Sequence, residues 1–418
     1  MHFASDDYVL EVLLMQIDAA GFRSTSKRWR MELLYISPEF PPNYANFILQ
    51  LNRLGVRVWA VGEADFYEMA PDLRSALQWY VRTDLRSPAA VDGAIGELFS
   101  VQSERGLAPH FDLVESHNEQ WLRLEAHINQ TRGIDGLRPA DMDRLKKKSA
   151  MKQLFRDSGL LFAPGEPVRS EVQATELAGR LGYPVILKPD EGVGSAGIHR
   201  IEDQEQLLRT VAQLNGEYLL EKFVDAPIVT YDGLVNYSGE PVFENSLVYA
   251  DGVLDCVLGK ETFFYVNRQM PARLAEIGRR LVRSLDIRRK FFHFEFFRIG
   301  DDYMPIEINC RPPGGAIVDM MNYSTDGDLY AAYARMISGA NAGLCGAKKY
   351  YCAYIGRRNR PYALTHADVL ARFEKMLVEH GSNPAIYWDA MGRYRYIFRS
   401  ASEAELLQTA AEILKTGI

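Results

Sequence analysis

Cysteine is scarce in this chain of 418 residues, and the few cysteines lack the spacing of metal or redox sites. None lies in a CxxC pair, and none has the neighbours that a zinc site requires. Chains of this kind are typical of a reducing compartment, so we expect a reduced, cytoplasmic protein. The four cysteines are Cys256, Cys310, Cys345 and Cys352.

Long apolar runs are also lacking. A helix that spans a bilayer needs roughly 18 consecutive apolar residues, and no run here approaches that length. The longest aromatic cluster, Phe291 to Phe297, is interrupted by His293 and Glu295. Acidic residues interrupt the apolar positions near the N-terminus in the same way, unlike a secretory signal. We therefore expect no membrane span and no membrane partner.

An excess of positive charge is the third feature that the sequence lacks. The net charge is −7, whereas non-specific binding of nucleic acid needs a basic surface. Internal repeats and low-complexity segments are not found either, which argues against a repeat architecture. What remains is an ordinary globular composition, 47% hydrophobic and 25% charged. The chain is long enough for about two or three domains.

The order of the expected elements divides the chain into four segments. Residues 1–30 have apolar side chains at helical spacing and predict an N-terminal helical extension. Residues 31–140 begin with strand, helix and strand, which predicts an α/β domain with a parallel sheet. Residues 141–225 predict a compact α+β unit with one glycine-rich loop. Residues 226–418 predict strands, with an early turn at Asp232-Gly233, and then mixed helices and strands.

The strongest chemical signal is a predicted hairpin. Its strands, Phe291–Arg298 and Tyr303–Arg311, are joined across Gly300-Asp301-Asp302. Because side chains alternate along a strand, the polar residues of each strand share one face and the phenylalanines share the other. A hairpin centred on Asp301 brings the two polar faces into register. The side chains on the polar face are then His293, Glu295, Glu307, Asn309 and Arg311.

In this register Glu295 lies opposite Glu307, and His293 lies opposite Asn309. Directly opposed carboxylates repel, and burying them without a partner would force one to take up a proton. A cation between them resolves the conflict, and two carboxylates with an amide oxygen suit Mg²⁺ or Mn²⁺ better than zinc. The alternative is an ordinary amphipathic hairpin whose polar face meets water. That alternative leaves unexplained the glycines that follow at Pro312-Pro313-Gly314-Gly315, which let a ligand approach the backbone.

Three weaker signals lie earlier in the chain. A glycine-rich loop, Lys188 to Gly197, could present backbone N–H groups to phosphate, although a simple hairpin connection fits it equally well. It matches neither a Walker A loop nor GxGxxG. The basic run Arg144 to Lys148 opens a helix expected to end near Gly159, and such runs are more often solvated helix faces. The segment Glu221 to Val224 ends a strand and could be only a strand edge.

Taken in this order, the four signals resemble the ATP-grasp superfamily over roughly residues 31 to 400. The resemblance implies a fold of α/β and α+β parts, the ATP-grasp fold behind an N-terminal α/β domain. It implies a small lid subdomain at 141–225 and a C-terminal mixed-sheet subdomain at 226–418 that carries the metal site. ATP would lie between these two subdomains, with Mg²⁺ or Mn²⁺ as the second cofactor.

The resemblance also assigns roles to single residues. Arg311 matches the arginine that steadies the acyl phosphate, although a salt bridge to Glu295 or Glu307 is its structural alternative. His293 either assists proton transfer or holds a neighbouring carboxylate, and we favour the second role. The residues that match the metal ligands are Glu295, Glu307 and Asn309. The implied nucleotide contacts are Lys148 (or Lys147 if the register is off by one), Lys188, Gly192, Gly194, Ser195, Gly197, and, at the adenine, Glu221, Phe223 and Val224.

Within the superfamily, the hairpin and the glycines after it look most like the branch that contains L-amino-acid ligases and biotin-carboxylase-like proteins. Two positions depart from the pattern of that branch. Ile228 stands where an acidic residue often contacts the ribose, which puts that contact in doubt. Lys290 and Phe291 stand where glycine often precedes the metal strand, which predicts an altered pocket wall beside the metal.

The resemblance implies an ATP-dependent carboxylate–amine ligase that works through an acyl phosphate and releases ADP and phosphate. Its expected partners are a small carboxylate and a small amine, with no nucleic acid, and a homodimer is compatible with this expectation. Two alternatives stay open. One is a biotin-carboxylase- or carbamoyl-phosphate-type enzyme that uses bicarbonate. The other is an ATP-binding regulatory protein without catalysis, which the intact metal set argues against.

Overall fold

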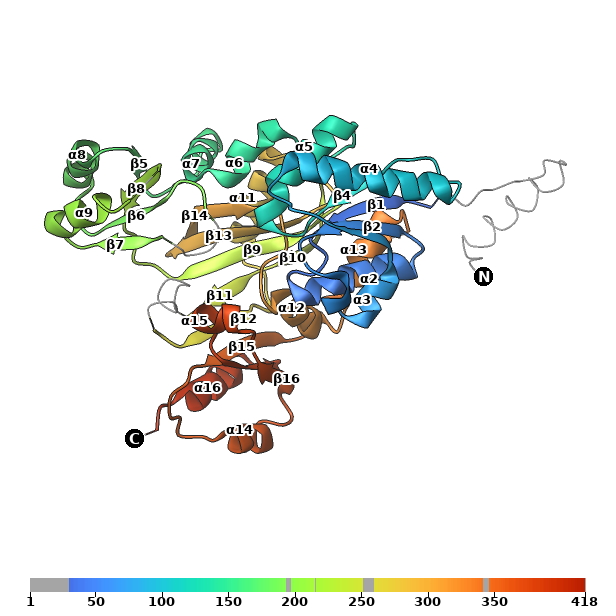
Figure 1. The fold of residues 1–418 in the computed structure, drawn as a ribbon. Coiled ribbons are helices and arrows are strands. Elements are labelled where there is room, and N and C mark those ends of the chain that lie inside the picture. The colour runs from blue at the N-terminus through green and yellow to red at the C-terminus, as the bar shows by residue number, and fades with distance from the viewer. Residues whose placement is uncertain (1–29, 193–196, 215, 251–258, 341–345, 418) are drawn as a thin grey trace, which may run out of the picture.

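The computed structural model describes residues 30–192, 197–214, 216–250, 259–340 and 346–417. They form three β-sheets with helices packed against them (Figure 1). One sheet falls in each of the segments 31–140, 141–225 and 226–418, as expected, whereas the domain boundaries themselves stay a prediction. The helical extension expected over residues 1–30 lies outside the described residues, apart from Arg30.

The N-terminal sheet is parallel, with the order β3-β2-β1-β4. Its strands are β1 (Glu32–Ile36), β2 (Arg57–Gly62), β3 (Leu77–Arg82) and β4 (Leu113–Glu115). Its helices are α2 (Ala45–Arg53), α3 (Pro71–Ala76), α4 (Pro88–Glu104) and α5 (Leu122–Arg132). Alternate residues of β1 and β2 pack on α2 and α3 on one face and on α4 and α5 on the other. Strands buried on both faces explain why they read as continuous apolar runs.

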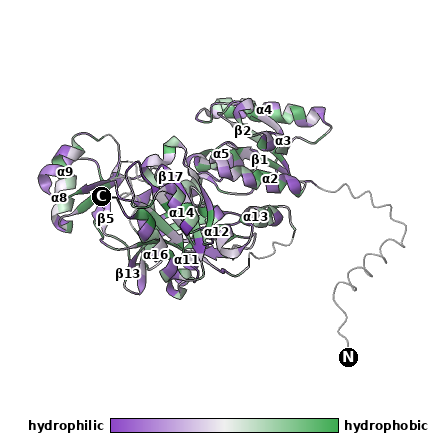
Figure 2. Ribbon diagram, turned by 90° about the horizontal axis from the view of Figure 1, so that it is seen from below, coloured by the Kyte–Doolittle hydropathy of each residue, from purple (hydrophilic) through white to green (hydrophobic). Residues whose placement is uncertain are grey.

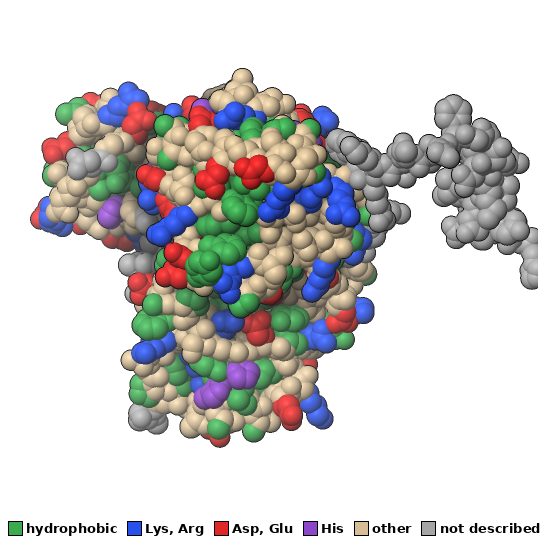
Figure 3. Space-filling model, turned by 45° about the vertical axis from the view of Figure 1, so that its right-hand side comes forward, with side chains coloured by type: hydrophobic (Ala, Val, Ile, Leu, Met, Phe, Trp, Pro, Cys, Tyr) green, Lys and Arg blue, Asp and Glu red, His purple; other side chains and the backbone are tan. Residues whose placement is uncertain are grey.

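The second sheet belongs to the lid, as we name residues 141–225, and lies at the left of Figure 1. It is antiparallel, with the order β5-β8-β6-β7. Its strands are β5 (Gly165–Val168), β6 (Val185–Pro189), β7 (His199–Ile201) and β8 (Tyr218–Lys222). The helices α8 (Glu171–Leu181) and α9 (Gln204–Val211) share a small core with these strands. In the space-filling view of Figure 3 the lid forms a separate lobe at the left of the molecule.

The helix expected from the basic run to Gly159 is two helices, so the prediction of a single helix is wrong. The helices are α6 (Met142–Lys146) and α7 (Lys148–Asp157). Lys147 between them is extended, with φ −93° and ψ 120°. Its main chain forms a β-bridge with Glu191, and the N–H of Lys148 donates to the carbonyl oxygen of Asp190 at 2.9 Å. A tertiary contact thus overrides local helix propensity.

The third sheet holds nine strands in the order β14-β13-β9-β11-β12-β15-β17-β16, with β10 also paired to β9. Its strands are β9 (Ile228–Val235), β10 (Pro241–Asn245), β11 (Leu247–Tyr249), β12 (Thr262–Val266), β13 (Phe291–Ile299), β14 (Asp302–Asn309), β15 (Tyr351–Arg357), β16 (Leu377–Ser382) and β17 (Tyr394–Ser400). The helices near it are α11 (Ala272–Ser284), α12 (Ile317–Thr325), α13 (Leu329–Ile337), α14 (His366–Arg372), α15 (Trp388–Met391) and α16 (Glu403–Leu414).

Helices cover both faces of this large sheet. Phenylalanines of β13 and apolar residues of β9 pack on α11, and α16 covers the same face further along. The other face packs on α12, α13 and the α2 face of the N-terminal domain. Helices such as α4 and α8 carry hydrophobic and hydrophilic residues in alternation along the ribbon, as amphipathic helices do (Figure 2). The polar face of the hairpin therefore opens on the side where the N-terminal domain sits.

The turn expected at Asp232-Gly233 is wrong, since both residues lie inside β9. Gly233 is needed there for packing rather than for a turn. A Cβ at Gly233 would lie 2.2 Å from the carbonyl oxygen of Phe243 and 2.6 Å from Cζ of Phe292. A glycine inside a strand often marks such a close approach. Asp232, fully buried, pairs in register with His293.

Buried charges join the start of β13 to the N-terminal domain. Lys290 Nζ lies 2.7 Å from Glu115 Oε1 and 2.8 Å from Glu125 Oε1, and all three side chains are almost fully buried. Burial opposes ionisation of Glu115, but Lys290 and His117 outweigh it and lower its pKa to about 2. Burial raises the pKa of Glu125 to about 7. Lys290 therefore links the large sheet to the N-terminal domain, and the altered pocket wall expected at Lys290 and Phe291 stays a prediction.

We expect Lys290→Met to lower the free energy of unfolding by about 3–5 kcal/mol, because it leaves buried carboxylates without their cation. Urea unfolding at pH 7 measures the change. Lys349→Met is the control, since Lys349 pairs with Asp326 at 3.0 Å on the surface, where losing an ion pair changes stability by less than about 1 kcal/mol. Equal effects of the two substitutions would contradict the buried link.

Candidate active site

The hairpin of β13 and β14 has the register that the sequence predicts. Glu295 pairs with Glu307, and His293 pairs with Asn309. The register shifts directly after Glu295, because Phe296 pairs with Pro305 and leaves Ile306 as an extra residue on β14. The facing pair therefore lies directly beside a β-bulge of the hairpin.

The two facing carboxylates are partly buried, with side-chain exposures of 26% for Glu295 and 17% for Glu307. Burial raises the pKa of both carboxylates, and neighbouring charges then decide the direction in which each pKa is shifted. His293, then Arg311 and Lys188, outweigh burial and hold the pKa of Glu295 below its usual range. Burial, reinforced by the charge of Glu295, holds the pKa of Glu307 above its usual range despite Lys148. The pair thus resists double ionisation unless a cation joins it.

His293 lies between two carboxylates. Its Nδ1 is 2.6 Å from Asp232 Oδ1, and its Nε2 is 3.4 Å from Glu295 Oε1. Burial alone would lower the pKa of His293, but hydrogen bonds to Asp232 and Glu295 raise it to about 9. A histidine that keeps its proton at neutral pH is a poor general base. The geometry favours the role of holding Glu295 over proton transfer.

Asn309 completes a set of oxygen ligands on this face. It is 3% exposed, and its Oδ1 has no hydrogen-bond partner among the described residues. A buried oxygen without a donor is unfavourable unless another group binds it. With the two facing carboxylates it suits a hard cation such as Mg²⁺, whose remaining positions nucleotide phosphates ordinarily fill. In the described ranges no group of three or more His, Cys, Asp or Glu side chains could hold a metal, so the protein would supply only part of the ligand shell.

Two lysines from distant parts of the lid are brought to this face. The β-carboxylate of Asp190, just after β6, accepts hydrogen bonds from the N–H of Ser149 at 2.7 Å and from its hydroxyl at 2.6 Å. A carboxylate at a helix N-terminus caps the free N–H groups and is favoured by the helix dipole. This contact fixes the start of α7 beside the end of β6, and therefore sets Lys148 near Lys188. Lys148 Nζ lies 3.8 Å from Glu307 Oε1.

Lys147, the other candidate for the first phosphate lysine, points elsewhere. Its Nζ lies 3.2 Å from Asp143 Oδ2, and both side chains are exposed. The structure therefore favours Lys148 over Lys147. The phosphate-contact role of Lys148 itself stays a prediction.

The segment Glu221–Val224, which we name the hinge, holds a second charge cluster. The Glu221 carboxylate pairs with Lys188 through Oε1 and with Lys152 Nζ at 2.8 Å through Oε2. These lysines outweigh burial and lower the pKa of Glu221. Each oxygen can still accept a further hydrogen bond, so the adenine contacts expected of Glu221, Phe223 and Val224 stay predictions. The guanidinium carbon of Arg200 lies 4.1 Å from the ring centroid of Phe223.

The glycine-rich loop is described only in part. Gly192 and Gly197 are described, whereas Gly194 and Ser195 lie outside the described residues. Gly197 has φ +73°, a conformation that other residues rarely adopt, and a Cβ there would lie 3.0 Å from Cγ of Pro189. The predicted phosphate contacts of the loop stay predictions.

Arg311 forms a salt bridge, but with a partner that the sequence did not suggest. Its Nε and Nη2 lie 3.2 Å and 2.9 Å from Glu119 Oε2, in the N-terminal domain, and its Nη1 donates to the carbonyl oxygen of Pro312 at 2.9 Å. Lys146 Nζ lies 3.2 Å from Glu119 Oε1. Lys146 is 6% exposed, so the solvated-face interpretation of the basic run is wrong for this residue. Arg311 and Lys146 outweigh burial and lower the pKa of Glu119.

Five residues of this region were not assigned a role from the sequence. Lys152 could have been found, because it lies four residues after Lys148 on the same helix face. The others have no local signal, since only tertiary contacts give them their neighbours. The five are Glu119, Lys146, Lys152, Asp190 and Asp232.

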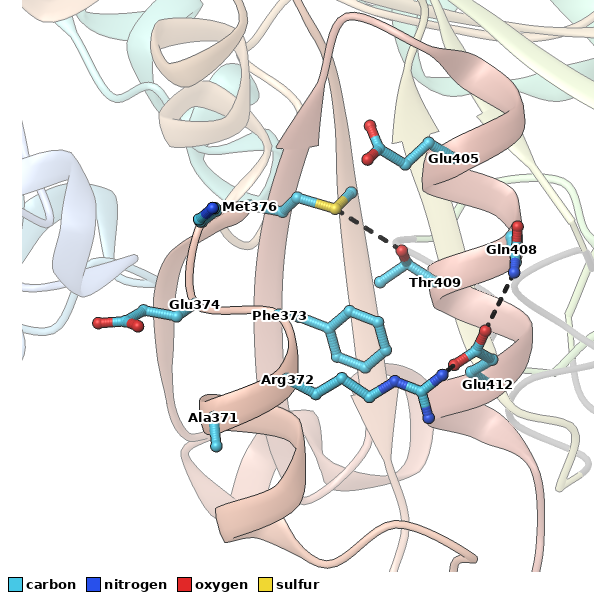
Figure 4. A pocket seen from close by; sticks show the side chains of 10 residues that line it. Ala371, Arg372, Phe373, Glu374, Met376, Glu405, Gln408, Thr409 and Glu412 are labelled. Atoms are coloured by element: carbon cyan, nitrogen blue, oxygen red, sulfur yellow. Dashed lines mark hydrogen bonds and ion pairs between the residues drawn. The ribbon is translucent and has the colours of Figure 1, made fainter.

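A separate cavity of about 490 Å³ lies between the end of α14 and α16 (Figure 4). Two of its charged side chains pair with each other, as Arg372 Nη2 lies 2.6 Å from Glu412 Oε2. Thr409 donates to the sulfur of Met376 at 3.8 Å. Figure 1 places α14 and α16 at the foot of the molecule, away from β13 and β14. The cavity is not part of the hairpin site.

Comparisons with known proteins find similarity over the part of the chain that carries the candidate site. The sequence profile described as "ATP-grasp domain" matches residues 181–319, which contain the glycine-rich loop, the hinge and the hairpin. The carbamoyl phosphate synthase large chain of Rubrobacter xylanophilus is 24% identical over 222 residues, 49% of this chain and 20% of that protein. The chain spans less than two thirds of the length of the first curated relatives, 20% and 58%.

Solved structures share the fold over most of the chain. L-amino acid ligase from Bacillus licheniformis has a TM-score of 0.70 at 16% identity, covering 92% of this chain and 97% of that chain. The biotin carboxylase domain of Hydrogenobacter thermophilus 2-oxoglutarate carboxylase, with MgADP and bicarbonate, has a TM-score of 0.60 at 13% identity, covering 92% and 90%. The fold is that of ATP-grasp proteins.

Among the described residues no helix is both long and apolar enough to cross a membrane.

We expect Glu307→Gln to weaken the Mg²⁺-dependent binding of a non-hydrolysable ATP analogue by about 10-fold or more, because it removes one of two ligand charges. Titration calorimetry with Mg²⁺ and with EDTA measures the effect. Glu244→Gln is the matched control, since Glu244 lies on β10 of the same sheet with 20% exposure and pairs with Arg279. Unchanged Mg²⁺-dependent binding by Glu307→Gln would remove the metal assignment.

Proposed function

We propose that this chain, which carries an ATP-grasp domain, is an ATP-dependent ligase that activates a small carboxylate as an acyl phosphate. The acyl group would pass to an amine, with release of ADP and phosphate. The observation that carries the proposal is the oxygen set on one face of the hairpin, with the orphaned Asn309 Oδ1 and lysines of the lid around it. The structural likeness to L-amino acid ligase supports an amine acceptor.

Positive charge is what the first chemical step requires. Attack of a carboxylate on the γ-phosphate brings anionic groups together, and their repulsion must be offset in the transition state. Lys148 approaches Glu307 from the lid, and Arg311 lies just after β14 of the large sheet, where Glu119 of the N-terminal domain holds it. His293 adds a fixed positive charge beside Glu295. Mg²⁺ held by Glu295, Glu307 and Asn309 would, when bound, neutralise the phosphates further.

The salt bridges of the lid suggest how Lys188 could change its partner from Glu221 to a phosphate. Lys188 pairs with Glu221 in this structure, so its charge is already desolvated and held at the end of β6. Lys152 keeps a second hold on Glu221, which leaves that carboxylate compensated if Lys188 turns to a phosphate. We propose that Lys188 makes this exchange when nucleotide binds.

Bicarbonate is a second candidate for the acid. The Hydrogenobacter thermophilus domain was crystallised with bicarbonate, and the Rubrobacter xylanophilus relative is a carbamoyl phosphate synthase chain. Bicarbonate can attack the γ-phosphate as a carboxylate does, so the same cations would serve both acids. The choice between them is an experimental one.

We expect ADP release in a screen that combines Mg²⁺-ATP with amino acids, other small carboxylates or bicarbonate, each with and without an amine. Hydroxylamine should trap the acyl phosphate as a hydroxamate, dependent on both ATP and the acid. Stimulation by bicarbonate alone would select the second candidate. Formation of AMP in place of ADP would mean an adenylate intermediate and would overturn the proposal.

We expect Arg311→Lys to lower kcat by about 10²-fold or more while binding of the ATP analogue is kept, because a lysine loses the planar fork that fits an acyl phosphate. Arg357→Lys is the control: Arg357 is also buried, but donates to the carbonyl oxygen of Ile413. It should lower thermal stability and leave kcat per folded molecule unchanged. The same pattern from Arg311→Lys would make Arg311 a structural residue only.

A further inference from the structure

Glu119 occupies an unusual position for a residue of the N-terminal domain. It begins the 3₁₀ helix Glu119–Trp121, four residues after β4, and its side chain is almost fully buried. Asn118 caps this turn, since its Oδ1 accepts the N–H of Gln120 at 3.0 Å. The turn is further anchored by the buried side chain of Trp121. The carboxylate of Glu119 is thus presented from a fixed backbone.

The contact between Glu119 and Arg311 leaves the guanidinium able to bind an anion. An arginine has five N–H donors in a rigid fork. Three are used: Nε and Nη2 donate to Glu119 Oε2, and Nη1 donates to the carbonyl oxygen of Pro312. Two donors remain, one on Nη1 and one on Nη2. Arg311 is therefore held along one edge and open at the nitrogens that a carboxylate or phosphate can engage.

The charge balance around Glu119 also favours binding of an anion. Glu119 carries one negative charge, while Arg311 and Lys146 carry two positive charges within 3.2 Å of it. A pair that only joined two domains would be neutral, and apolar residues of the same shape would join them equally well. This positive charge lies close to the carboxylate pair along the chain, since Arg311 follows Asn309, the last residue of β14, by two residues.

We propose that Glu119 is a positioning residue for Arg311, with Lys146 as its counter-charge, and that it serves the acyl-phosphate step rather than nucleotide binding. This role rests on the proposed function. Glu119 fixes the plane of the guanidinium, so that the two free N–H groups meet the anion without a search through side-chain rotamers. The N-terminal domain thereby contributes to the chemistry and not only to the shape of the site.

The test compares Glu119→Gln with Glu125→Gln in the full chain. Glu125 is a matched control, because it is as buried as Glu119 and lies in the same domain, but it contacts Lys290 and Ser116 instead of Arg311. We expect Glu119→Gln to lower kcat for ADP release by about 10- to 100-fold, the usual effect of losing a group that orients another. The KM for ATP and the affinity for the ATP analogue should stay within about twofold. Glu125→Gln should leave all three values near wild type.

Glu119→Asp keeps the negative charge but shortens the side chain, so it distinguishes the effect of the charge from the effect of its position. It should recover part of the lost kcat if the carboxylate still reaches Arg311. Wild-type turnover by Glu119→Gln, or an equal loss in Glu125→Gln, overturns the positioning role while leaving the ligase proposal intact. A lowered KM for the acid with kcat unchanged would make Glu119 a competitor of the substrate and would also overturn it. A wild-type chain that releases no ADP with any acid overturns the proposed function, and this role with it.

Discussion

The repulsion between Glu295 and Glu307 is the constraint on which the rest of the site depends. The two carboxylates face each other across β13 and β14, where neither is fully solvated. Like charges in this position are unfavourable, and the pKa of Glu295 falls while that of Glu307 rises. A sheet that only needed stability would not keep such a pair. Its retention makes sense when positive charge arrives from outside the hairpin.

Cations from different parts of the molecule lie near Glu295 and Glu307. Lys148 reaches this pair from the lid, Arg311 and His293 from the large sheet itself. Two of these cations are restrained by a further carboxylate: His293 by Asp232, and Arg311 by Glu119. Preorganised charges of this kind need little rearrangement when phosphates bind, which is the main way that enzymes stabilise developing charge.

Local patterns predicted the hairpin, and distant contacts decided the rest. Alternation along two adjacent strands and a short turn were enough to place Glu295 opposite Glu307, because register in a hairpin is a local property. The same local reasoning took Asp232-Gly233 for a turn. Only the neighbouring strands show that Gly233 must be a glycine for close packing and that Asp232 faces His293.

The basic run Arg144 to Lys148 shows most clearly what local sequence cannot predict. From sequence it is one helix with a solvated face, but a bridge to Glu191 breaks it at Lys147 and turns its lysines in different directions. Lys146 and Lys148 become buried, while Lys147 stays partly exposed. The partners that cause this lie more than 40 residues away or in another domain, so no window of the sequence contains them. The fold class could be predicted because it needs only the order of elements.

The two ends of the hairpin converge on one short stretch of the N-terminal domain. Lys290 directly precedes β13 and binds Glu115 and Glu125, while Arg311 follows β14 and binds Glu119. Residues 115–125, from the end of β4 into α5, therefore hold both strands. These contacts lie at the open end of the hairpin that pairs Glu295 with Glu307. The lid has no such double hold on the hairpin among the described ion pairs, since Lys148 alone reaches it, at 3.8 Å. The helices α6 and α7 of the lid share a core with β13, so the part of the lid that the proposed function requires to move is its sheet beyond them, while the ion pairs of the N-terminal domain hold the two facing strands.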